Sequence, residues 1–367
     1  MNITQIQIAQ LTIPLIRPFI TAVRRTDCVD DVVVIIKTDC GKLGYGSAAS
    51  TPAITGDNTE SIVTAIKTIL GPQLIGRNIS ELNLLLQMNN DGLPGNTSAK
   101  AAIDMALHDL FAQSRGLPLY QLLGGHTNSI SSCITISLKA TEAMVQDAVD
   151  LVKHGHQTIK IKLGSNPMDD IQRVQAIRQA VGNSITLLVD ANQGWSYEDS
   201  LKVIAAFQQQ HLHIPLVEQP VKAQDLQHLK AISDQVDCAI IADEACFSPE
   251  DTLKIAKMKA CDGVNIKLMK SGGIMNAQAI YSIAQTAQMK IMVGCMLESP
   301  IGVAAIASFA VSKPDIFYAD LDPIYLIREN YILGGAQRLG NKIILSEKPG
   351  LGIEGISQGL NQIGVIH

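Results

Sequence analysis

Five ionisable side chains recur at nearly constant spacing in the second half of this chain, each at the end of a short apolar run. They are Lys162, Asp190, Glu218, Asp243 and Lys267, separated by 28, 28, 25 and 24 residues. A gap of this size holds one strand, one helix and their connections. Because the carboxyl ends of parallel strands meet on one rim of a barrel, we expect all five side chains to face one site.

The repeat extends beyond these five positions. A β-rich run followed by a helical pattern occurs eight times, with strands expected at 132–138, 157–162, 186–190, 214–218, 239–243, 263–267, 290–294 and 315–320. Eight parallel strands are the number that closes a TIM-type barrel. The predicted fold class is therefore α/β, with the active face at the carboxyl ends of the strands.

The chain before the barrel has a different pattern. Strands are expected over 3–14 and 31–37, and apolar residues at intervals of three and four predict a helix over 99–114. We therefore expect an α+β domain over residues 1–125 and the barrel over 126–322. Residues 323–367 are too few for a domain, and we expect them to return to the first one.

Composition excludes several classes of protein. The 367 residues carry 29 Lys and Arg against 34 Asp and Glu, a net charge of -5 that gives no footprint for nucleic acid. The seven cysteines are odd in number and contain no C-x-x-C pair, so neither a disulfide framework nor a zinc ribbon fits. Neither a signal peptide nor a membrane-spanning run is recognisable. We expect a cytoplasmic protein without a membrane or nucleic-acid partner.

Three of the five rim residues are carboxylates on consecutive strands. Asp190, Glu218 and Asp243 would repel one another in one cleft unless a cation neutralised them, and oxygen-only ligands favour Mg²⁺ or Mn²⁺ over zinc. Each carboxylate alone could merely cap the following helix. Three in register make capping alone a poor explanation, so we expect a Mg²⁺ site.

The lysines flank these carboxylates in the chain. Lys160 and Lys162 lie two residues apart, hence on one face of a strand, where desolvation and a neighbouring positive charge would lower a lysine pKa. Lys267 follows the strand after Asp243 and would face them across the metal. Two bases on opposite sides of one carbon are what a racemase or epimerase needs. Alternatively, Lys267 forms only a salt bridge.

Five motifs at these positions resemble the enolase superfamily, specifically its muconate-lactonising-enzyme subgroup. They are Lys160-Ile-Lys162, Asp190-Ala-Asn192, Glu218-Gln-Pro220, Ala242-Asp-Glu244 and Asn265-Ile-Lys267. The resemblance spans the whole chain and implies a modified TIM barrel of (β/α)7β form with an α+β capping domain. It also implies that Asp190, Glu218 and Asp243 bind Mg²⁺ and that two lysines, Lys162 and Lys267, are the bases.

Further residues point to the substrate. Asp320-Leu-Asp322 resembles the signature of dipeptide epimerases, and two carboxylates at i and i+2 could bind a substrate ammonium. By the same resemblance, Arg24 in the loop 19–25 would bind a glutamate side chain. Lys160 is expected to contact the substrate. Thr135 is expected to contact the substrate or to belong to the core, and Glu298 to line the pocket or to hydrogen-bond a lysine. The pair Asp320 and Asp322 could also be only a turn before a proline.

The resemblance therefore implies a Mg²⁺-dependent isomerase that inverts the α-carbon of the second residue of a dipeptide, with L-Ala-D/L-Glu preferred. A muconate cycloisomerase or o-succinylbenzoate synthase type of lyase is the alternative, but its substrates carry no ammonium for the two aspartates. A third interpretation is a barrel without catalytic activity. Relatives are often homo-oligomers, so we expect the same of this chain.

Overall fold

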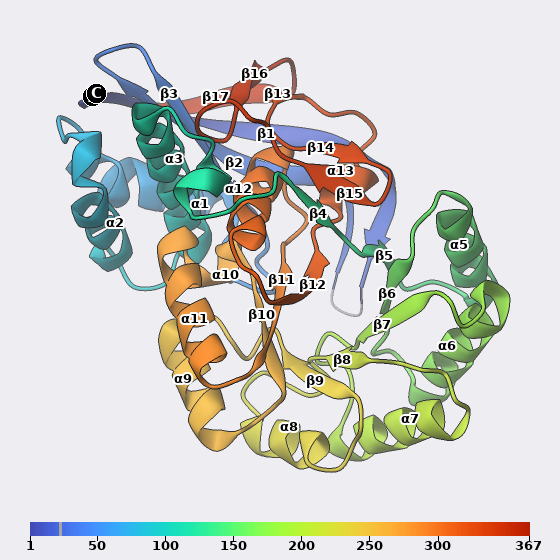
Figure 1. Ribbon diagram of the computed structural model, residues 1–367. Helices are drawn as coiled ribbons and strands as arrows, with labels where there is room; N and C mark the ends of the chain where they lie inside the picture. Colours follow the sequence, from blue (N-terminus) through green and yellow to red (C-terminus); the bar gives the residue numbers. More distant parts are fainter. Residues whose placement is uncertain (22–23) are drawn as a thin grey trace.

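The computed structural model describes residues 1–21 and 24–367 and is built around a nearly closed parallel barrel (Figure 1). Its eight strands follow one another in sequence order around the ring. They are β5 (Ile134–Ile136), β6 (Thr158–Lys162), β7 (Thr186–Asp190), β8 (Leu216–Glu218), β9 (Ala239–Ala242), β10 (Gly263–Ile266), β11 (Lys290–Gly294) and β12 (Ile316–Asp320). The amide of Cys133 donates to Ala319 O at 2.8 Å beside β5 and links the last strand to the first. The predicted strands are confirmed.

Helices join these strands on the outside of the ring. They are α5 (Thr141–Lys153), α6 (Pro167–Val181), α7 (Tyr197–Gln209), α8 (Leu226–Ser233), α9 (Pro249–Met258), α10 (Leu268–Ser271), α11 (Ile274–Thr286), α12 (Pro300–Val311) and α13 (Pro323–Leu326). The last strand is followed only by the one-turn α13, which gives the expected (β/α)7β form. Every residue of α12 is buried, because this helix packs between the barrel and the N-terminal sheet.

Alternation along the strands explains how polar side chains reach the inside of the ring. In β6, Ile159 and Ile161 belong to the apolar core, whereas Lys160 and Lys162 point the other way. The helices that follow begin at side-chain caps: Asn166 caps α6, and Ser248 caps α9 with a reciprocal contact to Asp251. These two caps fix the starts of α6 and α9 at the rim.

A second sheet, antiparallel and in the order β17-β1-β2-β3, lies beside the barrel (Figure 1). Its strands are β1 (Ile3–Ile20), β2 (Arg25–Thr38), β3 (Leu43–Ala49) and β17 (Leu360–Ile366). Its helical elements are α1 (Thr59–Ala65), η1 (Ile66–Leu70), η2 (Pro72–Leu74), η3 (Ile79–Glu81), α2 (Leu82–Asp91), α3 (Thr97–Arg115) and α4 (Leu119–Leu122). Gly46 allows α3 to pack closely, since an added Cβ would lie 1.8 Å from Ala102 O.

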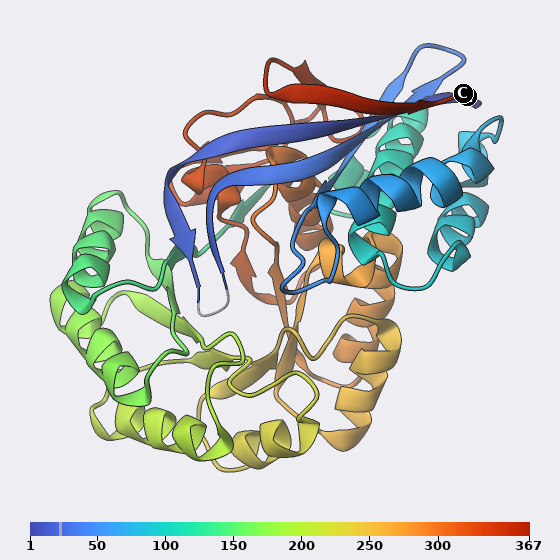
Figure 2. The same cartoon turned by 180° about the vertical axis from the view of Figure 1, so that it is seen from behind.

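The first two strands are longer than predicted. The expected strands ended at Pro14 and began at Asp31, but Pro14 stays in β1, opposite Cys28, and pairing continues to Ile20 after a register shift. The two strands form a long hairpin that extends from the sheet toward the barrel (Figure 2). Of the predicted loop 19–25, residues 22 and 23 lie outside the described part of the chain.

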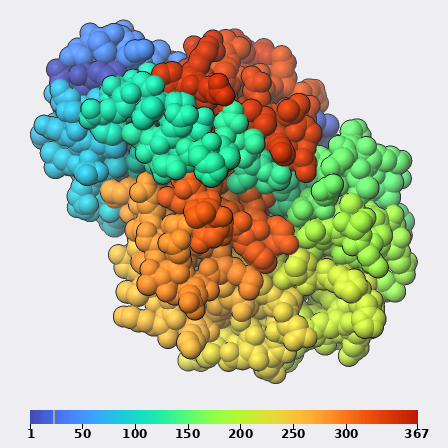
Figure 3. All heavy atoms as spheres, in the orientation of Figure 1, coloured from blue at the N-terminus to red at the C-terminus, as the bar shows by residue number. Residues whose placement is uncertain are grey.

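The end of the chain lies beside its beginning. Its short strands are β13 (Ile332–Gly334), β14 (Gln337–Leu339), β15 (Lys342–Ile344) and β16 (Ile353–Ile356), and β15 also pairs with β4 (Ser129–Ser131). The final strand, β17, pairs with β1, and the C-terminal segment lies next to N-terminal residues on the surface (Figure 3). Among the described residues, no helix has both the length and the apolar character needed to cross a bilayer.

Candidate active site

The order of the strands around the barrel decides which of the predicted rim residues lie side by side and which lie opposite each other. Asp190, Glu218 and Asp243 lie at the ends of the adjacent strands β7, β8 and β9, and all three are buried. Lys162 on β6 and Lys267 after β10 are four strands apart, which is the opposite side of an eight-stranded ring. The structure therefore brings the five residues to one rim with the lysines facing each other.

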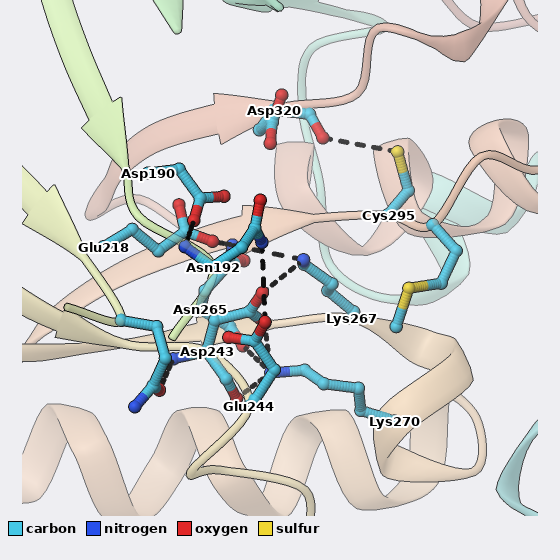
Figure 4. A network of polar contacts seen from close by, with 12 residues as sticks. Asp190, Asn192, Glu218, Asp243, Glu244, Asn265, Lys267, Lys270, Cys295 and Asp320 are labelled. Atoms are coloured by element: carbon cyan, nitrogen blue, oxygen red, sulfur yellow. Dashed lines mark hydrogen bonds and ion pairs between the residues drawn. The ribbon is translucent and has the colours of Figure 1, made fainter. Parts of the chain in front are cut away.

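Each of these lysines is paired with a carboxylate beside it. Lys162 Nζ lies 2.6 Å from Asp190 Oδ2. Lys267 Nζ lies 2.6 Å from Asp243 Oδ2, and Figure 4 shows this second pair. Burial would raise the pKa of both aspartates. The lysines outweigh burial and hold the pKa of Asp190 and of Asp243 below the ordinary value, so both are ionised at neutral pH.

The first lysine of the predicted pair lies deeper than expected. Lys160 is fully buried, and its Nζ lies 2.7 Å from Glu218 Oε2, 3.0 Å from Asp190 Oδ2 and 2.7 Å from Asp320 Oδ2. Burial alone would lower its pKa, but these carboxylates raise the pKa well above the ordinary value. The expectation of a lowered pKa is wrong for Lys160, because carboxylates rather than the second lysine surround it. The structure does not bring Lys160 to the surface of the cavity.

The two aspartates of the D-x-D motif lie across the ring from the carboxylates. Asp320 ends β12, which is four strands from β8 and therefore opposite Glu218. Thr135 on β5 holds both: its amide donates to Asp322 Oδ2 at 2.7 Å, and its hydroxyl lies 3.4 Å from Asp320 Oδ1. Burial, followed by the charge of Asp320, raises the pKa of Asp322 to about 6. All three residues line the central cavity.

The N-terminal hairpin covers this cavity, which has a volume of about 50 Å³. Phe19 and Arg24 line it from the hairpin, and Ile54 lines it from the loop after β3. Arg24 Nη1 lies 3.4 Å from Thr51 Oγ1, and burial lowers the pKa of Arg24. Arg25 instead points to solvent and pairs with Asp27 at 3.3 Å. The two adjacent arginines are therefore in different environments.

Glu298 lies behind the cavity rather than on its surface. It is buried, accepts the amide of Met296 at 2.8 Å and packs against Gly302 of α12, where an added Cβ would lie 2.0 Å from Glu298 Oε2. Met296 itself lines the cavity. Glu298 therefore supports the loop after β11. Burial, followed by the charge of Asp31, raises the pKa of Glu298 to about 8.

The raised pKa of Glu298 predicts a stability change with pH. A carboxyl that keeps its proton in the folded state up to pH 8, but loses it near pH 4.5 when unfolded, destabilises the fold as pH rises through that window. The expected loss is on the order of 5 kcal/mol above pH 8. In metal-free buffer, the unfolding free energy of Glu298→Gln should therefore fall less between pH 5 and 9. The exposed Glu347→Gln serves as the control, and parallel curves for parent and Glu298→Gln would contradict the assignment.

The formal charge of the lysines and carboxylates at this site fits a divalent cation. Four lysines, Lys160, Lys162, Lys267 and Lys270, face six carboxylates, Asp190, Glu218, Asp243, Glu244, Asp320 and Asp322, which leaves a formal charge of -2. Burial, followed by neighbouring aspartates, raises the pKa of Glu218 and of Glu244 to about 7. A divalent cation would balance the cluster.

Unpaired acceptors at the strand ends fit the same cation. Asn192 Oδ1, Glu244 Oε2 and Asn265 Oδ1 are buried and accept no hydrogen bond. Over residues 1–21 and 24–367, no three His, Cys, Asp or Glu side chains are close enough together to hold a metal ion, since the carboxylates are turned toward lysines. Oxygen donors alone suit Mg²⁺, so the residues present fit this ion.

Three of these residues were not predicted to have roles. Asn192 and Glu244 line the cavity, and Asn192 Nδ2 lies 3.4 Å from Glu244 Oε1. Both lie in motifs already noted, one or two residues after a carboxylate, and that position was the available signal. Lys270 is on α10, three residues after Lys267, and lies beneath Asp243 in the view of Figure 4. Its spacing from Lys267 on a one-turn helix was the signal for it.

Comparison with known proteins identifies the group to which this barrel belongs. Residues 3–124 match the family model described as "Mandelate racemase / muconate lactonizing enzyme, N-terminal domain", and residues 143–357 match "Enolase C-terminal domain-like". The L-Ala-D/L-Glu epimerase of Clostridium acetobutylicum is 46% identical over 97% of this chain and 100% of its own length.

Solved structures of dipeptide epimerases have the same fold as this chain. A substrate-liganded complex of the L-Ala-D/L-Glu epimerase from Bacillus subtilis superposes with a TM-score of 0.96 at 40% identity, covering 98% of this chain and 100% of that one. A dipeptide epimerase from Enterococcus faecalis, complexed with Mg and L-Leu-L-Tyr, gives a TM-score of 0.93 at 39% identity, covering 96% of this chain and 99% of that one.

The chain belongs to the enolase superfamily. Within it, the chain groups with the dipeptide epimerases and is therefore an isomerase. The predicted family, fold and enzyme class are confirmed.

Proposed function

We propose that this protein is a Mg²⁺-dependent epimerase of L-Ala-D/L-Glu that inverts the α-carbon of the second residue. The observation that carries the proposal is the pair of crossing lines in the barrel. One line runs from the carboxylates around Glu218 to Asp320, and the other joins Lys162 to Lys267. A dipeptide lying along the first line has its α-carbon between the two lysines.

The ends of a dipeptide match the ends of the first line. Asp320 and Asp322 would bind the substrate ammonium through charge-assisted hydrogen bonds, with Thr135 holding both carboxylates in place. Asp190, Glu218 and Asp243 would hold Mg²⁺ at the other end. When bound, Mg²⁺ supplies a positive charge that stabilises negative charge developing on the substrate carboxylate. Lys160 would position both ends, since its Nζ contacts Glu218 and Asp320 together.

The two lysines would move the protons. One removes the proton from the α-carbon and leaves an enediolate, and the other, still protonated, returns a proton to the opposite face. Each lysine must leave its aspartate to reach the substrate, so the pairs with Asp190 and Asp243 describe the resting site. Phe19 and Ile54 exclude water above the cavity.

Arg24 supports a glutamate in the second position. Arg24 lines the cavity from the hairpin and is free of any carboxylate partner among the ion pairs of the described residues. A substrate carboxylate would supply the missing partner through two hydrogen bonds. With Mg²⁺ balancing the charge of -2 on the lysines and carboxylates, the other charges also cancel, because Ala-Glu carries a net charge of -1 and Arg24 carries +1.

The alternatives fit the site less well. Substrates of muconate cycloisomerase or o-succinylbenzoate synthase carry no ammonium, so Asp320 and Asp322 would face them as two buried carboxylates without a cation from the substrate. A barrel without activity would keep ten buried ionisable groups that cost stability and have no use. The epimerase proposal gives eight of these groups a role: three bind the metal, two bind the ammonium, two move protons and Lys160 holds the two ends in place.

The proposal is tested by proton NMR of L-Ala-L-Glu with the protein and Mg²⁺ in D₂O. We expect inversion, with deuterium entering the α-carbon of the second residue. The variant Arg24→Met should lower kcat/KM for L-Ala-L-Glu by about 10- to 100-fold, the value of a charged hydrogen bond. It should affect L-Ala-L-Leu far less.

The exposed neighbour Arg25 provides the matched control, and Arg25→Met should behave as the parent. Absence of inversion and exchange with every dipeptide tested would overturn the epimerase proposal. Equal losses for both dipeptides in Arg24→Met would remove only the assignment of glutamate. Division of the chain at residues 125 and 322, location in the cytoplasm and assembly as a homo-oligomer stay predictions.

A further inference from the structure

A fourth lysine lies beneath the site and has no part in the proposed reaction. Lys270, on the one-turn helix α10, is 1% exposed. Its Nζ donates to Asp243 O at 2.5 Å and to Asn265 O at 2.9 Å, and it lies 2.6 Å from Asp243 Oδ1. Lys270 therefore connects the ends of β9 and β10 and contacts the Asp243 carboxylate.

Lys270 does not reach the substrate. It is absent from the cavity lining, whereas Lys267, three residues earlier, is part of it. The ring of Phe247 covers the ammonium from another side, with its centroid 5.6 Å from Nζ. Two donors of the ammonium bind the main-chain oxygens of Asp243 and Asn265, and Nζ also forms an ion pair with Asp243 Oδ1. Proton transfer to a substrate is therefore closed to Lys270, and any role must act through Asp243.

The two lysines on Asp243 differ in what they can do during the reaction. Lys267 binds Oδ2 at 2.6 Å from the cavity side and must release it to act on the substrate. Lys270 pairs with Oδ1 and does not line the cavity, so no step of the proposed reaction requires it to move. When Lys267 leaves, Lys270 is the lysine that stays paired with this carboxylate.

We propose that Lys270 is a positioning residue that fixes the Asp243 carboxylate for the metal, whether or not Lys267 is engaged with substrate. The inference rests on the proposed Mg²⁺ dependence. Coulomb's law alone makes the opposite prediction, because a positive charge next to a ligand weakens cation binding, and its removal should tighten it. Loss of Mg²⁺ affinity on removal of Lys270 would therefore identify positioning.

The test is calorimetric titration of Mg²⁺ into the full-length protein without substrate. Lys270→Met, which keeps the length of the side chain but not its charge, should bind Mg²⁺ about 10- to 100-fold more weakly than the parent, as expected for loss of a group that orients a metal ligand. Lys267→Met removes the same charge from the other oxygen of Asp243. It should bind Mg²⁺ at least as tightly as the parent, because the positioning contact from Lys270 is kept.

Each outcome decides the point. If folded Lys270→Met binds Mg²⁺ as tightly as the parent or more tightly, the lysine does not position Asp243. If Lys270→Met does not fold, Lys270→Gln, which keeps a donor for the main-chain oxygens, takes its place under the same criterion. If neither folds, the role is in folding and the proposal fails. A parent protein that binds no Mg²⁺ would instead refute the proposed metal dependence.

Discussion

Lys267→Ala should lower the rate of inversion of L-Ala-L-Glu by about 10³-fold or more, because one of the two proposed proton donors and acceptors is lost. Exchange of the α-proton with solvent should survive for one of the two epimers. Lys162, four strands away across the ring, can still remove the α-proton that faces it. In D₂O, deuterium should enter one epimer without inversion, as proton NMR and polarimetry on the same sample would show.

Lys162→Ala should give the complementary result, with exchange in the other epimer. The exposed Lys153, whose side chain is 68% accessible, provides the control, and Lys153→Ala should keep the parent rate. Inversion at the parent rate in Lys267→Ala or Lys162→Ala would contradict the two-base mechanism. Exchange in the same epimer for both variants would place both lysines on one side of the substrate, against the arrangement in the barrel.

Removal of divalent cations should abolish activity, and Mg²⁺ or Mn²⁺ should restore it. The expected loss is at least about 10³-fold, since a metal that stabilises charge in the transition state contributes several kcal/mol. Saturating Mg²⁺ should also raise the unfolding free energy by about 3 kcal/mol at one hundred times its dissociation constant. Thermal unfolding with and without Mg²⁺, after chelation, measures the second effect without substrate.

The variant Asp243→Asn distinguishes the effect of bound Mg²⁺ from a general effect of ionic strength. It removes one proposed ligand and should lose both the Mg²⁺-dependent rate and the Mg²⁺-dependent increase in stability. Potassium chloride at matched ionic strength should leave the chelated parent inactive. Full activity after chelation, or equal stabilisation of the parent and Asp243→Asn by Mg²⁺, would show that the cluster around Glu218 holds no catalytic metal.

The rim of the barrel could be predicted from sequence because parallel strands repeat at a regular interval and end on one side. Asp190, Glu218 and Lys267 needed only this spacing and the expectation that strand ends converge. The hairpin over the cavity could not be predicted in the same way. Its length depends on pairing that continues past Pro14, and such pairing is decided by the partner strand rather than by local sequence.

Partners of individual side chains were also beyond the sequence. Alternation along β6 places Lys160 and Lys162 on one face, but it does not show that Lys160 extends to the centre of the barrel and meets Asp320 across the ring. Glu298 is similar: its position after β11 suggested the cavity, and contact with Met296 keeps it behind the surface. Both outcomes depend on depth within the barrel, which periodicity does not report.

The crossing lines in the barrel have a consequence for the supply of product. In the proposed reaction, Asp320 and Asp322 at one end and the carboxylates around Glu218 at the other bind the same groups of both epimers, and only the proton changes sides. Substrate and product therefore compete for one site with similar affinity, and net conversion stops when the two epimers reach their equilibrium in solution. A cell would obtain a steady yield of one epimer only if a second enzyme, selective for that configuration, continually consumed it.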